Sequence, residues 1–361
     1  MSIWKWADYI DAVPAEHRIT LGEGNTPVVR SKKIGPQAGL NNLHFKLEIG
    51  NPAGSFKDRF GAAAISHMLA NGKTECIATS SGNTGSALAA YCAATEVTCR
   101  IAIVEPAPEG KLKQMMAYGA DIYKVKKFGI DPEVTKDTFA ILQEFGAQPN
   151  AAIQVSSYIY SPAGMSGVET ISFELAEQFD KPVDHVFCQS GGGGLCLAIA
   201  RGYRKFVEAG KLKTSPAIHC VQPEGNDTIA GPFRSGATEA QEVHCTTNIS
   251  GLQVANVNDG HLVIEECRPT GGTGHLVTDD FVWETQKRLS QEEGIFCEPA
   301  AAVALAGALQ AAANGEIDPD ATTVCLITGT GFKDEVSVER MYGGKSCRLL
   351  DLTELRGYLE G

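Results

Sequence analysis

One lysine lies in a stretch of small and polar residues, NPAGSFKDRFG at 51–61. Lys57 follows Gly, Ser and Phe, and the chain then continues as AAAISHML, which has the composition of a buried helix. A lysine is usually found at the surface. A lysine that is desolvated in a cleft instead has a lowered pKa, which suits it to forming a Schiff base. Lys57 is therefore a candidate catalytic residue.

Three further stretches place polar residues or glycines between an apolar run and a helix. SSGNTG at 80–85 offers backbone N–H groups and hydroxyls for an anion, and its Ser and Asn would equally serve as helix caps. GGGG at 191–194 allows close backbone approach at the start of a helix, which favours a phosphate site over a flexible turn. Thr328 ends a buried strand, where it would either contact a ligand ring nitrogen or begin an ordinary turn.

Together, the four junctions match the groups of one cofactor and its substrate. Pyridoxal 5'-phosphate carries an aldehyde for a lysine, a phosphate for a glycine-rich loop and a pyridine nitrogen for a hydroxyl. An amino-acid substrate adds a carboxylate for the loop at 80–85. The sequence therefore predicts a pyridoxal-phosphate enzyme that acts on a small-molecule amino acid.

Short apolar runs alternate with helical patterns along the chain. Strands are expected at 44–49, 75–81, 99–104, 121–125, 184–190, 217–222 and 322–328, and helices at 58–70, 84–94, 110–119 and 195–210. This alternation predicts an α/β fold with two domains of mostly parallel sheet flanked by helices. We expect a small domain over 60–160 and a large domain over 1–59 and 161–361, with the cofactor in the cleft between them. Segment 235–282 has weak periodicity, and we expect irregular surface or a subunit contact there.

Composition excludes several classes of protein. The 361 residues carry a net charge of −12 without a long Lys/Arg run, which is unfavourable for nucleic acid and membrane surfaces. The 11 cysteines form no CxxC pair, so we expect free thiols and no metal site. The N-terminus lacks an apolar signal core, and no stretch approaches the roughly 18 apolar residues of a membrane span. We therefore expect a cytoplasmic protein.

The order of six short motifs resembles the fold-type II pyridoxal-phosphate enzymes, the group with a fold like that of the tryptophan synthase β chain. Within this group the chain is most similar to threonine synthase, over about residues 20–340. The motifs are EGNTP at 23–27, NPAGSFKDR at 51–59, SSGNTG at 80–85, GGGGL at 191–195, EPAAA at 298–302 and TGTGFKD at 328–334.

The resemblance implies a role for each matching residue. Lys57 would form the Schiff base and later move protons, Asn83 would hydrogen-bond the ring hydroxyl, and Thr328 would face the pyridine nitrogen. The residues expected to bind the cofactor phosphate are Gly191, Gly192, Gly193 and Gly194. The residues expected to bind the substrate carboxylate are Ser81, Gly82 and Thr84. The family also implies a homodimer.

The segment at 156–170 departs from the threonine synthase pattern. Threonine synthases usually have an Asn-Ser pair there, followed by an Arg that grips the substrate phosphate. Here Ser156 and Ser157 replace the pair as candidate substrate-binding residues, and Gly164 or a neighbouring residue falls where the Arg would be. A guanidinium is the natural clamp for a phosphate dianion, and Arg59 and Lys333 are the candidates to compensate for its absence.

The leading interpretation is a lyase or synthase that uses β/γ-elimination and replacement, converting O-phosphohomoserine and water into threonine and phosphate. The missing Arg keeps open a threonine or serine dehydratase, or a β-replacement enzyme similar to cysteate or cysteine synthase. From a different class, a non-catalytic pyridoxal-phosphate carrier or a nucleotide-binding α/β protein is also possible. Lys57 argues against the nucleotide-binding protein, which has no need of a lysine there.

Overall fold

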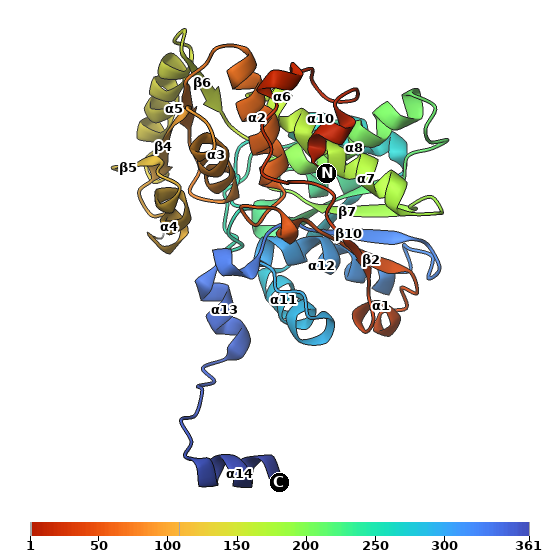
Figure 1. Cartoon of the computed structure of the whole chain (residues 1–361). Helices are drawn as coiled ribbons and strands as arrows, with labels where there is room; N and C mark the ends of the chain where they lie inside the picture. The colour runs from red at the N-terminus through yellow and green to blue at the C-terminus, as the bar shows by residue number, and fades with distance from the viewer. Residues whose placement is uncertain (1, 108, 361) are drawn as a thin grey trace.

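The body of the chain consists of two β-sheets, each covered by helices (Figure 1). The computed structural model describes residues 2–107 and 109–360. A four-stranded sheet has the order β5-β4-β3-β6, and a six-stranded sheet has the order β1-β2-β10-β7-β8-β9. In the described residues the strand pairs are parallel, except that β1 runs antiparallel to β2. The predicted α/β fold of mostly parallel sheets flanked by helices is confirmed.

The elements alternate along the chain in the manner the apolar pattern predicts. The strands are β1 Val28–Arg30, β2 Leu43–Leu47, β3 Glu75–Ala78, β4 Thr98–Val104, β5 Asp121–Val125, β6 Ala151–Gln154, β7 His185–Gln189, β8 Ala217–Pro223, β9 Gly274–Val277 and β10 Thr323–Ile327. The helices are α1 Ile34–Gln37, α2 Lys57–Ala70, α3 Asn83–Ala93, α4 Glu109–Ala117, α5 Pro132–Gly146, α6 Pro162–Ser166, α7 Thr170–Gln178, α8 Gly194–Glu208, α9 Ala230–Ser235, α10 Gly260–Cys267, α11 Asp279–Glu293, α12 Pro299–Ala313, α13 Glu335–Tyr342 and α14 Leu352–Glu360.

The smaller sheet uses strands from residues 75–154, and Figure 1 shows it at one side of the molecule with α3, α4 and α5 around it. Helix α2 packs against both α3 and α6, so its buried face belongs to the apolar core that the two parts of the chain share. The domain boundaries at 60 and 160 stay a prediction.

Helix α12 lies close against the larger sheet because most of its residues are small. Its sequence is PAAAVALAGALQAAA, and it contacts β7, β8, β9 and β10. A Cβ added at Gly307 would lie 2.6 Å from Cγ2 of Val221 on β8, so glycine permits this approach. The close packing fixes the N-terminus of α12 beside the ends of the strands.

The expectation of irregular surface over 235–282 is partly wrong. Residues 236–259 contain no helix or strand, but α10 and β9 follow within the segment, and β9 adds a parallel edge strand to β8. Strand β9 has the sequence GHLV, which is too short to show the alternation of apolar and polar residues that predicts a strand. Its pairing with β8 stabilises it as a strand instead.

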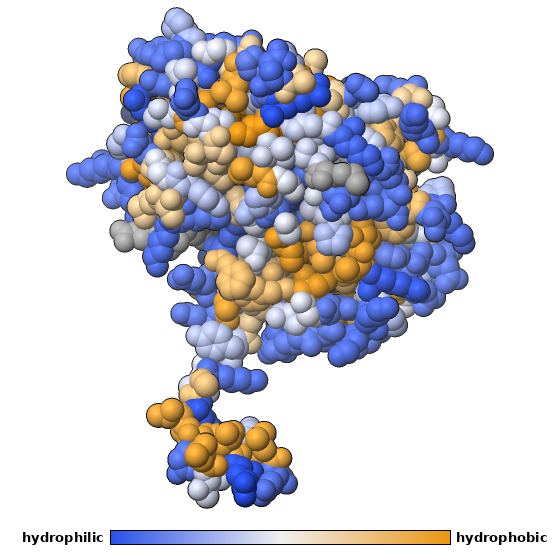
Figure 2. All heavy atoms as spheres, in the orientation of Figure 1, coloured by the Kyte–Doolittle hydropathy of each residue, from blue (hydrophilic) through white to orange (hydrophobic). Residues whose placement is uncertain are grey.

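The C-terminal helix α14 lies apart from the body, at the end of an extended segment (Figure 1). Figure 2 shows hydrophobic residues gathered on this separate helix, where Leu352 is 86% exposed and Leu359 is 76% exposed. Among the described residues, no helix combines the length and the apolar character needed to cross a bilayer.

Candidate active site

A cavity of about 600 Å³ lies where strands of both sheets end. Strands β3, β6, β7 and β10 are each followed by residues that line it. The carboxyl ends of parallel strands are where ligands bind in open α/β sheets. The structure brings together in this wall every residue that the sequence singled out for the site: Lys57, Ser81, Gly82, Asn83, Thr84, Ser156, Ser157, Gly191, Gly192, Gly193, Gly194 and Thr328.

Backbone contacts hold the turn before Lys57 against the C-terminal end of strand β10. Lys57 is the first residue of α2, and the N–H of Phe56 donates to the carbonyl oxygen of Thr328 over 2.9 Å. Ser55 forms an antiparallel bridge with Gly329. Gly54 has a φ of +87°, a conformation that favours glycine, and lets the chain turn back toward the strand end. The small residues before Lys57 therefore form a turn that positions the lysine.

The side chain of Lys57 ends inside the cavity. Its Nζ donates to Oγ of Ser156 over 2.6 Å, and that oxygen lies 2.8 Å from Oγ1 of Thr84. Burial lowers the pKa of Lys57 to about 8, although the carboxylates of Asp259 and Glu298 oppose this change. A lowered pKa raises the neutral fraction of the amine, which is the nucleophilic form.

The four glycines form a narrow loop between β7 and α8. Gly193 has a φ of +101° and lies at the N-cap of α8. A Cβ at Gly192 would lie 2.8 Å from Nδ2 of Asn258, and one at Gly191 would lie 3.0 Å from Cγ2 of Val254. In the described residues no side chain caps this helix. The loop therefore offers backbone N–H groups and a helix N-terminus to an anion at close range.

Two buried polar atoms beside this loop are suited to a bound ligand. Oγ of Ser190 and Oε1 of Gln189 have no hydrogen-bond partner within the described part of the chain. Both residues line the cavity. Since buried polar groups nearly always have a partner, a bound group with donors and acceptors fits here. Nε2 of Gln189 donates to Oγ1 of Thr328 and so fixes that hydroxyl at the end of β10.

Two carboxylates hold the predicted site residues in place, and sequence reasoning assigned no role to either. Oε1 of Glu298 accepts a hydrogen bond from Nδ2 of Asn83 over 2.8 Å. Oδ1 of Asp259 accepts from Oγ of Ser157 over 2.9 Å, and burial raises the pKa of Asp259. Glu298 begins the EPAAA motif at the N-cap of α12, which was a usable signal. Asp259 lies in a segment without periodicity, so only the fold reveals it.

The loop that begins α3 is partly committed to internal contacts. Gly82 is the N-cap of α3, and among the described residues no side chain caps this helix. The N–H of Gly82 donates to Oγ of Ser80 over 3.2 Å. Ser81 and Thr84 line the cavity, whereas the hydroxyl of Ser157 is bound to Asp259. Ser81 and Thr84 therefore stay candidates for binding a substrate carboxylate, although the hydroxyl of Thr84 also contacts that of Ser156 at 2.8 Å.

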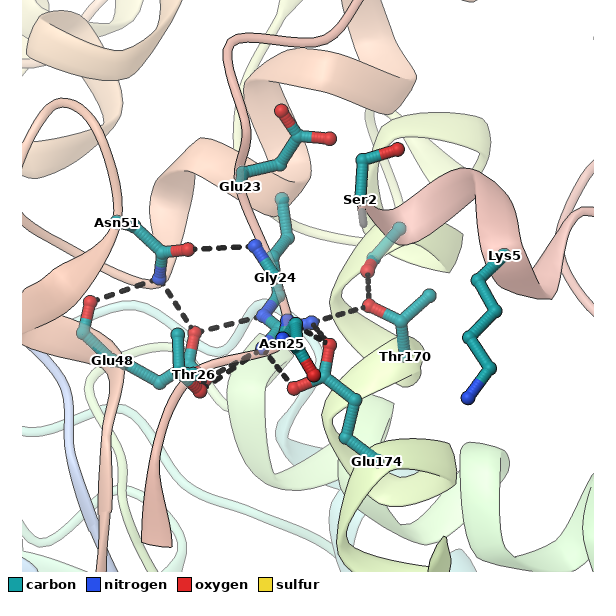
Figure 3. Close-up of polar contacts among 12 residues, drawn as sticks. Ser2, Lys5, Glu23, Gly24, Asn25, Thr26, Glu48, Asn51, Thr170 and Glu174 are labelled. Carbon is teal, nitrogen blue, oxygen red and sulfur yellow. Dashed lines mark hydrogen bonds and ion pairs between the residues drawn. The ribbon is translucent and has the colours of Figure 1, made fainter.

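Arg59 does not supply the missing phosphate clamp, so that expectation is wrong. Its guanidinium is fully buried and contacts the carboxylates of Glu48 at 2.8 Å and Glu174 at 2.6 Å. Figure 3 shows these two carboxylates approaching the network from opposite sides. Lys46 adds a contact of 2.6 Å to Glu174. A buried network of this kind is structural, because its charges are already paired.

Lys333 does line the cavity. Its Nζ donates to Oε1 of Gln114 over 2.8 Å, and burial lowers the pKa of this lysine while the carboxylates of Glu298 and Asp58 oppose the change. Among the described residues, the charged side chains of the cavity wall are Lys57, Glu298 and Lys333. Much of the remaining wall is apolar and comes from Ile103, Val104, Phe128, Phe139 and Phe332.

The cavity thus combines a desolvated lysine, a glycine loop at a helix N-terminus and polar side chains at strand ends, which are the features that a pyridoxal-phosphate site on an α/β fold requires. The family model "Pyridoxal-phosphate dependent enzyme" matches residues 19–329. The chain belongs to this family, its cofactor is pyridoxal 5'-phosphate, and it is a pyridoxal-phosphate-dependent lyase of fold type II.

The chain is similar to two threonine synthases in sequence, and to a threonine deaminase and a serine racemase in fold. Threonine synthase of Methanocaldococcus jannaschii is 30% identical over 92% of this chain and 81% of its own length. Threonine synthase of Methanosarcina acetivorans is 31% identical over 93% and 81%. The fold is similar to that of threonine deaminase isoform 2 from Solanum lycopersicum, with a TM-score of 0.74, 20% identity and coverage of 94% and 92%. Serine racemase from Dictyostelium discoideum gives a TM-score of 0.68, 25% identity and coverage of 85% and 92%.

Proposed function

We propose that this chain converts O-phosphohomoserine and water into threonine and phosphate. The observation that carries the proposal is the position of Lys57. Its amine lies in a cavity together with a glycine loop for the cofactor phosphate and hydroxyls for a substrate, 2.6 Å from Ser156. Similarity to threonine synthases over most of the chain supports this choice of reaction within the family.

Three parts of the cavity wall would hold the cofactor. The loop Gly191–Gly194 would bind its phosphate, Asn83 would hydrogen-bond its ring hydroxyl, and Thr328 would face its ring nitrogen. When bound, the cofactor withdraws electrons from the substrate's α-carbon and makes the α-proton acidic. Thr328 offers a neutral hydroxyl rather than a carboxylate, and therefore does not hold a proton on the ring nitrogen.

Lys57 then acts as the general base and acid. Its amine, with a pKa of about 8, accepts a proton near neutral pH and returns it at a later step. Ser156 orients Nζ and connects it to Thr84, since both hydroxyls lie within hydrogen-bond distance of one another. Ser81, Gly82 and Thr84 bind the substrate carboxylate at the start of α3, where the helix dipole favours an anion.

Lys333 is the candidate cation for the phosphate of the substrate. It lies in the cavity wall, whereas Arg59 is enclosed in its own ion-pair network. A lysine binds phosphate as a point charge and gives weaker geometric control than a guanidinium would.

A threonine or serine dehydratase is the second candidate. The specific observation in its favour is the absence of an Arg at the position of Gly164, together with the apolar wall of the cavity. A β-replacement enzyme, similar to a cysteate or cysteine synthase, stays open for the same reason. A homodimer and a cytoplasmic location also stay predictions.

The first test uses the purified protein loaded with pyridoxal phosphate. We expect a yellow protein whose visible absorption is lost in Lys57→Ala under the same conditions. The second step mixes the wild-type protein with O-phosphohomoserine, phosphoserine, threonine, serine and O-acetylserine, and measures spectral change and released phosphate. Release of phosphate with formation of threonine supports the proposal. A response to unphosphorylated amino acids alone would replace it with the dehydratase or β-replacement reaction.

A further inference from the structure

Three cysteine thiols meet in the interior of the smaller sheet, away from the cavity residues. Cys76 lies on β3, Cys99 on β4 and Cys92 on α3, and their sulfur atoms all lie within 4.8 Å of one another. Cys76 and Cys99 are register partners on neighbouring parallel strands, while α3 packs over β3 and β4. The fold therefore brings together three thiols that are separated by 16 and 7 residues in the sequence.

The three thiols interact and are enclosed. Cys76 is 0% exposed, Cys92 2% and Cys99 6%. Thiolates, rather than thiols, are the ligands of soft ions. The three sulfur atoms lie close enough together to ligate one soft ion when their protons leave.

The number of ligands and the apolar surroundings select the kind of ion. Within the described residues, the group contains three sulfur ligands and no carboxylate or imidazole, whereas a structural zinc site takes four ligands. A charged complex would be costly to bury in the core. Three thiolates carry three negative charges, so a trivalent ion gives a neutral complex. A monovalent or divalent ion bound to all three thiolates would leave a net charge in the core.

We propose that Cys76, Cys92 and Cys99 form a three-thiolate site for a trivalent thiophilic ion of the arsenite type. One As(OH)₃ condenses with three thiols: three As–S bonds form, three As–O bonds break, and each thiol proton leaves with a hydroxide as water. The oxidation state of arsenic and sulfur does not change, so no oxidant or reductant is needed. The expectation of no metal site rested on the absence of CxxC spacing, which does not detect ligands gathered from two strands and a helix.

A second group of buried cysteines lacks this arrangement and supplies the control. Sγ of Cys196 lies 3.7 Å from Sγ of Cys267, while Cys188 and Cys220 lie nearby on neighbouring strands. Among the described residues, this second group does not bring three sulfur atoms within 4.8 Å of one another. Cys220 is as deeply buried as Cys76, so a Cys220→Ala change makes a comparable cavity without touching the proposed site.

Occupation of the site would connect both ends of the segment that carries the substrate loop. Cys76 lies just before the loop at 79–82, and Cys92 lies in the last turn of the helix that follows it. A three-way sulfur bridge restrains the strand, the loop and the helix in the folded protein. We therefore expect bound arsenite to raise the unfolding temperature of the holoenzyme, since a ligand that binds only the folded state stabilises it.

The test titrates the reduced holoenzyme with sodium arsenite. Arsenic that stays bound after desalting is counted by mass spectrometry, and X-ray absorption measures its sulfur neighbours. We expect one arsenic per chain with three sulfur neighbours, and at least tenfold weaker binding in Cys92→Ala and Cys99→Ala. Cys220→Ala should bind as the wild-type protein does. The visible absorption of the bound cofactor, retained in each variant, verifies that it is folded.

Three results would overturn the proposal. The first is no arsenic retained by the wild-type protein. The second is arsenic with only two sulfur neighbours, which would indicate a pair such as Cys196 and Cys267. The third is unchanged affinity in folded Cys92→Ala or Cys99→Ala, or in Cys92→Ser if the alanine variant does not bind cofactor. None of these readouts depends on which amino acid the enzyme converts.

Discussion

Replacing Lys57 with methionine should stabilise the cofactor-free protein near neutral pH. Burial lowers the pKa of Lys57 from 10.5 to about 8, so the folded state disfavours the charged amine. A tenfold change in proton affinity corresponds to about 1.4 kcal/mol, so the penalty is at most about 3 kcal/mol below pH 8. Water in the cavity still reaches the partly exposed side chain, and the lost hydrogen bond to Ser156 removes about 1 kcal/mol of the gain.

The sign of the pH dependence follows from proton binding. Between pH 8 and 10.5 the unfolded chain keeps the proton on Lys57 while the folded chain has released it. The unfolded state therefore binds more protons, and the stability contributed by Lys57 rises with pH across this interval. The advantage of Lys57→Met over the wild-type protein should shrink by up to about 3 kcal/mol from pH 7 to above pH 10.5.

The assay is urea unfolding of the cofactor-free wild-type protein and the Lys57→Met variant at steps from pH 6 to 10.5. Subtracting the free energies of unfolding of the two proteins cancels the contributions of the other titrating groups. Lys211→Met is the control, because Lys211 is exposed and its substitution should give a pH-independent difference. A constant difference between wild type and Lys57→Met across the range would refute the claim that burial perturbs this lysine.

Two further predictions follow from the same structure. Arg59→Met should lower the free energy of unfolding by about 3–5 kcal/mol, because Glu48 and Glu174 would be left buried without their partner. Urea unfolding measures this loss. The control is Arg100→Met, which removes an exposed ion pair with Glu75 and should cost less than about 1 kcal/mol. Gly192→Val should weaken pyridoxal-phosphate binding at least tenfold, since its Cβ would lie 2.8 Å from Nδ2 of Asn258, whereas Gly50→Ala, at a site with no atom within 4 Å, should leave the fluorescence titration unchanged.

Local sequence patterns were sufficient to predict the strands and helices that carry the site residues. The glycines at 191–194 and the buried strand before Thr328 have strong local signals, because glycine runs and continuous apolar strands each have few structural uses. The sequence could not indicate which residues outside these motifs would contact the site residues. Asp259 illustrates this limit: it follows a stretch without helix or strand, and only the pairing of β9 with β8 and the packing of α10 on α8 bring it to Ser157.

Arg59 shows why a motif can be identified correctly and one of its residues still misassigned. Arg59 lies two positions after Lys57 on α2, and residues two apart on a helix point in different directions. Lys57 consequently faces the cavity, while Arg59 faces Glu48 beside β2 and Glu174 on α7. The ion-pair network therefore anchors α2 from the side opposite the cavity, and the position of Lys57 depends on that anchor. The arginine of NPAGSFKDR therefore positions α2, and its paired guanidinium does not reach an anion in the cavity.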